Sequence, residues 1–358
     1  MAQSTHPSFR EQAKAALAEI EFQGEGIDLW AHEPWCQLIL ANDWVAPKWS
    51  DPAWSAQKKY EWYSVCHAAF ENYCEPPEIA DVGPTLVRWG NQSASGVVDD
   101  ILNLSTRWAM CLFEPSAANK VVLDGERLSG RKYQVRHLAR ADHLLVVAED
   151  AHGPGYALVH CMKDTLGMSV NLDSGLSQAT ETGQVLFEDV QILKVLGHLP
   201  DEDTLQTLHL QTVATFLGRS GALARQLALA EIEINRHELD DLSTRHAELS
   251  VELLALQATE GRACAMEAGS EANSIPWSLL QAKGTTLELK TGELLVDTFG
   301  YYALPYPDEM TLHNEGAIGS GESLKATKRM LLATEQVNYA HLAGDLYDIA
   351  ALDLGFAK

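Results

Sequence analysis

Few residues of this sequence have side chains and spacings suited to catalysis, metal binding or phosphate binding. Cys66, His67 and Cys74 lie close together like metal ligands, but no second pair of ligands follows them. We therefore interpret them as buried thiols on a helix and predict no metal site. The glycines between positions 316 and 321 have no lysine behind them, which favours a surface loop over a phosphate cradle.

The charge balance excludes several classes of function. The chain has 358 residues, with 26 Lys and Arg against 50 Asp and Glu, which gives a net charge of -24. Nucleic acids and anionic membranes attract clustered Lys and Arg, so neither is an expected partner. No apolar run approaches the roughly 18 residues of a membrane span, and no signal peptide is evident. We expect a cytoplasmic protein in which the six cysteines are reduced.

The hydrophobic pattern changes twice along the chain and predicts three domains. Residues 1–105 show helical spacing, clearest over 9–20, and are interrupted by prolines and tryptophans. Residues 106–200 contain short apolar runs separated by turn residues. Residues 201–358 return to long runs of helix-forming residues.

The middle stretch reads as a small antiparallel β-barrel or sandwich. A hairpin is expected over 121–130, with Asp124-Gly125 as its turn. Further strands are predicted in the following runs: 109–113, 144–148, 156–160 and 183–190.

Six segments of the sequence follow one another in a specific order. They are Leu40–Trp49, Gly83–Gly90, Phe113-Glu114-Pro115, Leu128–Lys132 followed by Ala141-Asp142, Val185–Val190, and Arg236–Leu239. With the order of helices, β module and helices, these segments resemble the acyl-CoA dehydrogenase family over most of the chain.

The resemblance implies a fold and a reaction. The expected fold is α+β multidomain, with an N-terminal helical domain, a middle antiparallel β-barrel-like domain and a C-terminal four-helix bundle. In that family a glutamate removes the α-proton of an acyl-CoA thioester, and FAD accepts the β-hydride. FAD and an acyl-CoA are therefore the implied cofactor and substrate.

The resemblance assigns FAD binding to five positions, and three of them have changed in this chain. The five positions are Leu112, Phe113, Gln134, Arg136 and Arg236. Phe113 replaces the serine or threonine that contacts the flavin, and Gln134 replaces a tryptophan. Arg136 replaces the threonine that bonds flavin N5. The resemblance therefore implies a weakened flavin site.

The catalytic base is also missing from the places where the resemblance puts it. One place falls at Gln211 and the other at Tyr339, with Ala343-Gly344 as an alternative alignment. None of these is a carboxylate, and an amide cannot serve as the base near neutral pH. Glu335 lies one turn before the second place and is more readily explained as a solvated glutamate. The catalytic residue is thus left unknown.

Arg236 is the best preserved of the cofactor-binding candidates. The family's arginine reaches the FAD pyrophosphate of a neighbouring subunit, where its planar cation suits two phosphate oxygens. The alternative is a surface arginine that pairs with Glu233 or Asp240 at helical spacing. The sequence leaves both open.

We hypothesise that the chain is an acyl-CoA dehydrogenase subunit with an impaired site of its own. Some members of the family handle bulky, steroid-type acyl-CoAs as α2β2 tetramers, in which a flavin-bearing subunit pairs with a short one that lacks flavin contacts. Such a partner subunit is expected here. A self-sufficient FAD-dependent acyl-CoA dehydrogenase and a non-catalytic acyl-CoA-binding or scaffold protein remain alternatives. The sequence does not identify the acyl group or the electron acceptor.

Overall fold

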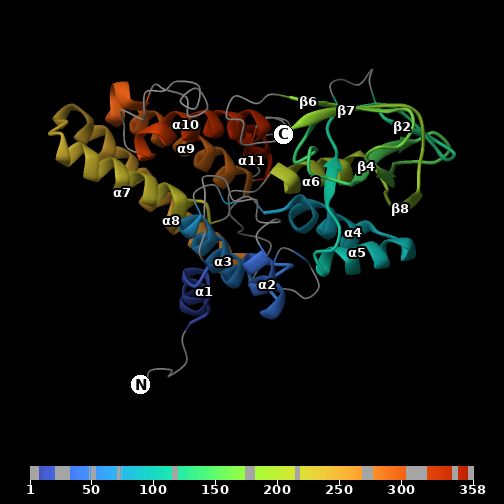
Figure 1. Cartoon of the computed structure of the whole chain (residues 1–358), viewed down its shortest axis with the longest axis horizontal. Helices are drawn as coiled ribbons and strands as arrows, with labels where there is room; N and C mark the ends of the chain where they lie inside the picture. The colour runs from blue at the N-terminus through green and yellow to red at the C-terminus, as the bar shows by residue number, and fades with distance from the viewer. Residues whose placement is uncertain are drawn as a thin grey trace. The chain divides into compact units, whose positions relative to one another are not determined.

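The computed structural model describes residues 8–20, 33–47, 49, 54–70, 73, 75–114, 120–173, 182–213, 218–267, 277–303, 321–340 and 346–353. The chain forms two compact units. The helical unit comprises Met1–Glu21, Ser55–Tyr73 and Ala214–Lys358, and the sheet unit comprises Phe22–Trp54 and Cys74–Val213 (Figure 1). The division into three domains at 105 and 200 stays a prediction.

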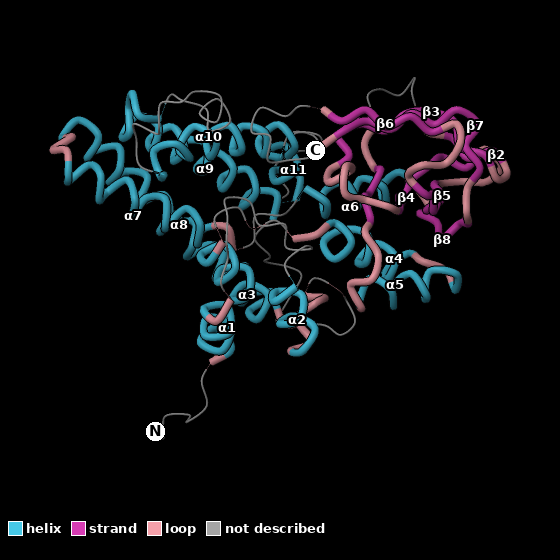
Figure 2. The backbone as a smooth tube through the Cα atoms, viewed as in Figure 1, coloured by secondary structure: helices cyan, strands magenta, loops and turns pink. Residues whose placement is uncertain are grey.

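The sheet unit contains one eight-stranded sheet (Figure 2). Its strands run in the order β6-β7-β3-β2-β4-β5-β8, and β1 pairs with β4. Their bounds are β1 Trp108–Cys111, β2 Val122–Asp124, β3 Arg127–Val135, β4 His143–Asp150, β5 Tyr156–Met162, β6 Met168–Leu172, β7 Gly183–Gln191 and β8 Lys194–Leu199. All the predicted strands are confirmed, whereas β6 and β8 were not predicted.

Two details of the predicted β module need correction. The pairings of β1 with β4 and of β2 with β4 are parallel, so the sheet is mixed rather than wholly antiparallel. The hairpin turn consists of Gly125 and Glu126, because Asp124 still pairs with Arg127. Gly125 has a φ of 61°, which glycine adopts without strain.

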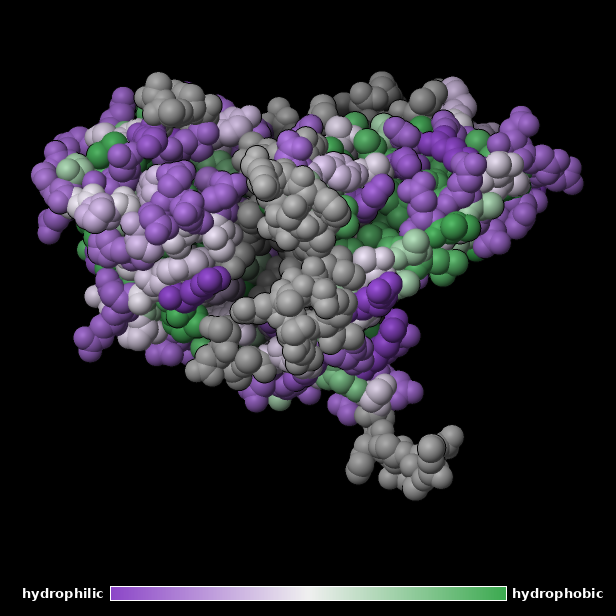
Figure 3. Space-filling view, turned by 180° about the vertical axis from the view of Figure 1, so that it is seen from behind, coloured by the Kyte–Doolittle hydropathy of each residue, from purple (hydrophilic) through white to green (hydrophobic). Residues whose placement is uncertain are grey.

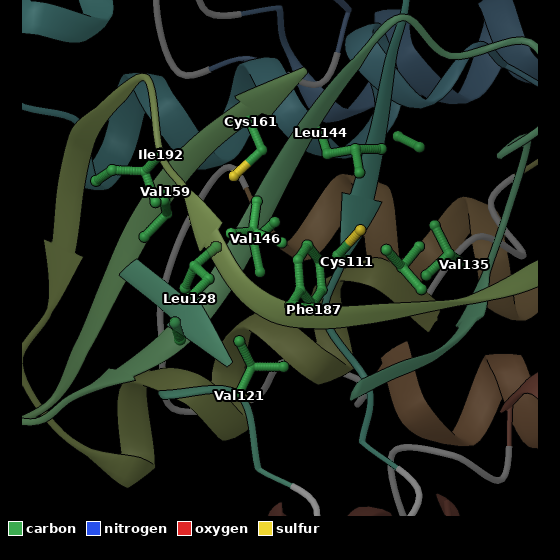
Figure 4. Close-up of a cluster of buried hydrophobic side chains, with 14 of the residues drawn as sticks. Cys111, Val121, Leu128, Val135, Leu144, Val146, Val159, Cys161, Phe187 and Ile192 are labelled. Atoms are coloured by element: carbon green, nitrogen blue, oxygen red, sulfur yellow. The ribbon is translucent and has the colours of Figure 1, made fainter. Parts of the chain in front are cut away.

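Alternating side chains of the strands make one hydrophobic core (Figure 4). Phe187 lies at its centre and is 2% exposed. Leu128 from β3 and Leu144 and Val146 from β4 belong to the same core and are fully buried. Burial of this apolar surface is the main stabilising contribution to the sheet unit.

Helices complete the sheet unit. They are α2 Glu33–Ala41, the π-helix η1 Glu78–Val82, α4 Gly83–Trp89, the short η2 Gln92–Ala94, α5 Ser95–Leu102 and α6 Glu202–Val213. The indole of Trp49 donates a hydrogen bond of 2.9 Å to the carbonyl of Ile79. The same ring lies where a Cβ on Gly83 would be, at 1.9 Å from that position. Two of the six segments that carry the family resemblance therefore meet in one packing contact.

The helical unit consists of long helices. They are α1 Phe9–Ala18, α3 Ala56–Ala69, α7 Ser220–Arg236, α8 Asp240–Glu267, α9 Trp277–Phe299, η5 Gly300–Ala303, α10 Gly321–Ala340 and α11 Leu346–Asp353. Ser8 and Glu11 form a reciprocal capping box that begins α1. The α7, α8 and α9 helices pack against one another through a shared leucine-rich core. No helix in the described part of the chain is long and apolar enough to cross a membrane.

Candidate functional site

The residues after β1 surround a buried lysine. The ammonium of Lys132 donates hydrogen bonds to the carbonyl of Leu112 (2.9 Å) and to Oε1 of Glu114 (2.8 Å). The same Glu114 oxygen accepts the backbone N–H of Val121 at 2.9 Å. The Lys132 side chain is only 2% exposed. We call Leu112, Glu114, Val121 and Lys132 the Lys132 cluster.

Burial and charge act in opposite directions on this lysine. Burial lowers the pKa of Lys132, while the Glu114 carboxylate raises it. A buried cation is tolerated when a carboxylate and a carbonyl satisfy its donors. The Lys132 cluster therefore fixes the chain after β1 to strand β3, and Leu112 supplies its carbonyl to this contact.

Phe113 is buried and lies in the chain between Leu112 and Glu114 of the Lys132 cluster. Its ring packs against the imidazole of His209 from α6, with ring centroids 5.0 Å apart. Burial, with the nearby Lys132 cation, lowers the pKa of His209 to about 4, so this imidazole is neutral at physiological pH. The Nε2 atom of His209 is buried and has no hydrogen-bond partner among the described residues. Sequence reasoning missed His209, because nothing local marks it.

Gln134 and Arg136 lie at the end of β3. Gln134 has a φ of 52° at a bulge between Lys132 and Val135, where the register against β7 shifts. The guanidinium of Arg136 pairs with the carboxylate of Asp81 from η1 at 3.3 Å. Both side chains are largely buried, at 12% and 5% exposed. The Arg136 cation is thus neutralised within the chain.

Arg236 ends α7 in the helical unit. Its guanidinium pairs with Glu233 one turn earlier at 2.6 Å, and 61% of its side chain is exposed. His237 approaches the same Glu233 carboxylate at 3.4 Å. The Glu233 carboxylate is only 10% exposed, so an Arg236 that turned to another anion would leave this carboxylate to His237.

The two predicted base positions lie on helices. Gln211 is in the last turn of α6 and Tyr339 is near the end of α10, and the side chains of both lie outside the described residues. Ala343-Gly344 also lies outside them. Glu335 is half-buried on α10.

The buried carboxylates of the helical unit have partners from the same unit. Glu288 pairs with Arg219 at 2.8 Å. Glu260 is fully buried and accepts bonds from Ser220 Oγ (2.5 Å) and from the N–H of Gly218 (3.1 Å). Because these carboxylates are engaged in helix packing, none of them is presented as a base to a ligand.

The predicted absence of a metal site concerns Cys66, His67 and Cys74. His67 is buried with its ring edge-on to Tyr73, at 5.1 Å between centroids, and Cys66 is buried on the same helix. Cys74 lies outside the described residues. Among the residues that the structure describes, no three His, Cys, Asp or Glu side chains are grouped to hold a metal ion.

No protein-family model and no curated protein matches the sequence. A FAD-dependent dehydrogenase matches with a TM-score of 0.76 and 16% identity over 100% of both chains. The Tcur3481-Tcur3483 steroid ACAD, an acyl-CoA dehydrogenase, matches with a TM-score of 0.74 and 16% identity over 98% of this chain and 97% of that chain. The ChsE4-ChsE5 complex from Mycobacterium tuberculosis matches with a TM-score of 0.72 and 12% identity over 98% of this chain and 97% of that one.

This chain has the acyl-CoA dehydrogenase fold. The predicted fold class is therefore confirmed along the full length.

The motif residues that this acyl-CoA dehydrogenase fold retains have packing roles. Gly83 accommodates Trp49, and Lys132 binds Glu114. A Cβ on Gly130 would lie 2.3 Å from the carbonyl of Lys120, and the φ of Gly130 is 132°. These contacts give Gly83, Lys132 and Gly130 packing roles that do not require a cofactor.

We expect Lys132→Met to destabilise the protein by about 3 kcal/mol or more, because it leaves the Glu114 charge without its cation. Urea unfolding followed by tryptophan fluorescence measures the change. The double variant Lys132→Met with Glu114→Gln should recover part of the loss, since no charge is then left unpaired. A single variant as stable as the wild type would show that the Lys132 cluster does not hold the fold.

The Glu260 carboxyl should make stability depend on pH. Burial raises its pKa from 4.5 to about 7, so its contribution to stability is complete below pH 4.5 and is lost as the pH rises through 7. The shift corresponds to roughly 3 kcal/mol. The unfolding free energies of wild type and Glu260→Gln should be measured from pH 5 to 8. The wild type should lose stability relative to the variant as the pH rises, because only the wild type has a carboxyl that ionises at this position. Glu252→Gln, on the exposed side of α8, is the control and should follow the wild-type profile; a Glu260→Gln profile parallel to wild type would contradict the assignment.

Proposed function

We propose that this chain is a subunit of an acyl-CoA dehydrogenase complex and takes part in the FAD-dependent α,β-desaturation of an acyl-CoA thioester, with its own flavin and base site impaired. The full-length acyl-CoA dehydrogenase fold supports the reaction class. The contact between Phe113 and His209 supports the impaired flavin site. Phe113 occupies the position at which the family resemblance places a hydroxyl that contacts the flavin.

The side chains at the expected flavin contacts do not fit a flavin. Phe113 has no polar side-chain atom, and its ring is already covered by His209. Arg136 replaces a threonine, and its cation is paired with Asp81. The carbonyl of Leu112 accepts from Lys132. Freeing Arg136 would leave the buried Asp81 carboxylate without this partner, which is costly. We therefore derive no redox step within this chain.

Proton abstraction also falls to another chain under this proposal. Gln211 and Tyr339 offer no carboxylate at the expected positions. Glu260 and Glu288 are engaged by Ser220 and Arg219. The base and the flavin are consequently assigned to a partner subunit that has both.

Arg236 is the residue of this chain that would contact the FAD of that partner subunit. Its side chain is mostly exposed, and its present partner Glu233 is only one turn away. A guanidinium of this kind binds two phosphate oxygens at once. We propose that Arg236 contacts the pyrophosphate of FAD bound to the partner subunit.

The proposed substrate is the CoA thioester of a bulky, steroid-type acid. The support is the similarity to the protein named as a steroid ACAD. The similarity to the ChsE4-ChsE5 complex supports assembly with a second chain. The alternative of a self-sufficient enzyme has one observation in its favour, the full-length match to a FAD-dependent dehydrogenase.

The purified chain should be colourless, because its flavin contacts are engaged by its own residues. Absorbance between 350 and 500 nm measures bound flavin. Co-expression with a flavin-bearing acyl-CoA dehydrogenase subunit should give a yellow complex that reduces an electron acceptor with an acyl-CoA. A yellow preparation of the chain alone that turns over an acyl-CoA would establish the self-sufficient enzyme instead.

Arg236→Ala should lower the flavin retained by the complex at least severalfold after gel filtration, because one phosphate contact is lost. The circular dichroism spectrum and the melting temperature should stay close to those of the wild type. Arg127→Ala is the matched control, since Arg127 is another exposed arginine in an ion pair, with Asp189 at 3.6 Å. Equal flavin content in both variants would show that Arg236 only pairs with Glu233 and does not contact FAD.

A further inference from the structure

The two edges of the sheet differ in how their backbone groups are satisfied. At the β8 edge, the N–H of Asn91 donates to the carbonyl of Leu196 at 2.6 Å, and Gly90 forms a bridge with Gly197. Strand β6 forms the opposite edge. Within the described residues, its outer side makes one backbone hydrogen bond, which closes the turn before the strand. Unpaired N–H and C=O groups along an edge are a template for pairing with another strand.

Two hydrogen bonds at the ends of β6 show which of its backbone groups face outward. Asp173 donates to the carbonyl of Thr182, and Glu188 donates to the carbonyl of Gly167, both at 2.9 Å. Bonded and non-bonded pairs alternate along an antiparallel ladder, so the odd-numbered residues from 167 to 173 bond to β7. The residues whose N–H and C=O groups point away from the sheet are Met168, Val170 and Leu172.

The same three residues place apolar side chains on one face of the strand. Val170 and Leu172 are 38% and 49% exposed, and Met168 packs partly against the core of the sheet unit. Elsewhere on this unit, at the left of Figure 3, hydrophobic side chains are scattered among hydrophilic ones. We call the outer side of Met168–Leu172 the β6 edge.

The β6 edge lacks the features by which sheet edges usually avoid other strands. Its five residues include no lysine, no proline and no charged residue, and its register against β7 has no bulge. Natural proteins use those features to keep edge strands apart. An uncharged and regular edge is therefore suited to binding a further strand.

We propose that the β6 edge pairs with the β6 edge of a second copy of this chain, antiparallel, about a twofold axis at Val170. In this register the two Val170 residues exchange both of their N–H and C=O bonds. The N–H of Leu172 donates to the carbonyl of Met168 in the other copy. The two sheets then form one continuous sheet, and the contact uses the same surface on both subunits.

The sequence of the β6 edge selects a second copy as the occupant. It is symmetric in character about Val170, with apolar residues at 168 and 172 and short polar residues at 169 and 171. Antiparallel pairing about this centre therefore puts apolar side chains together on one face and polar side chains together on the other.

Charge also favours this antiparallel register. Two chains that each carry a net charge of -24 repel one another, so their contact requires a surface without charge, and β6 has none. Asp173, which follows the strand, would lie opposite Gly167 of the other copy. A parallel pairing would instead put Asp173 beside Asp173, which is unfavourable. The pairing rests on the sheet unit alone and does not depend on the proposed enzymatic role.

Charges introduced at the axis test the pairing in the purified full-length chain. Sedimentation equilibrium should find that the wild type self-associates. Val170→Lys or Val170→Glu places a charge directly opposite itself and should raise the dissociation constant roughly tenfold or more. An equimolar mixture of the two variants places a lysine opposite a glutamate and should associate about as tightly as the wild type. A monomeric wild type, or a mixture as weak as each variant alone, would overturn the proposal.

Ser169→Lys is the matched control for an added charge on the same strand. Its side chain lies on the other face of β6, opposite the uncharged Asn171 of the second copy, so this variant should associate like the wild type. Circular dichroism should show that all these variants are folded, because both positions are exposed or half-buried at a sheet edge. Equal weakening by Ser169→Lys and Val170→Lys would contradict the proposed register.

Disulfide formation gives a second readout that does not depend on charge. Val170→Cys should form a disulfide-linked dimer under mild oxidation, because the Cα atoms of such a pair lie about 5.5 Å apart. Leu172→Cys is the control on the same face, since its two copies would lie about 13 Å apart along the strands at roughly 3.3 Å per residue. Equal cross-linking of the two variants would refute the twofold axis at Val170.

Discussion

The buried ion pair between Lys132 and Glu114 is the constraint on which the sheet unit depends. An ammonium that is 2% exposed can stay charged only if nearby oxygens bind it, and Glu114 and the Leu112 carbonyl do so. These bonds fix the segment after β1 against β3. They also place Phe113, whose ring then meets His209 of α6. One polar contact thus determines both the local fold and what surrounds the expected flavin-binding residues.

The retained and the altered parts of the family pattern follow different physical demands. Glycines at 83 and 130 are needed because Trp49 and the Lys120 carbonyl occupy the space of a side chain. Such demands persist as long as the fold does. Phe113 and Arg136, which the resemblance assigned to flavin binding, instead contact residues of this chain: Phe113 packs on His209 and Arg136 pairs with Asp81. This division is what the proposed function expects of a chain that does not bind its own flavin.

Sequence reasoning succeeded where the pattern is local. The alternation of β4, β5 and β7 reflects burial of one or both faces, and their positions were predicted. The edge strand β6 was missed because its side chains are mostly exposed and leave no hydrophobic pattern. The pairing of Phe113 with His209 and of Glu260 with Ser220 could not be predicted, since residues 40 or more positions apart meet only through the tertiary fold. The family resemblance located the candidate positions, but only the structure gives their partners.

The flavin content per chain in a purified complex measures whether this chain binds FAD itself. Protein-bound FAD would be released by denaturation, quantified by absorbance and divided by the molar amount of each subunit. The account predicts one FAD per partner subunit and none for this chain, so that an equimolar complex carries one FAD for every two chains. One FAD per chain, including this one, would contradict it.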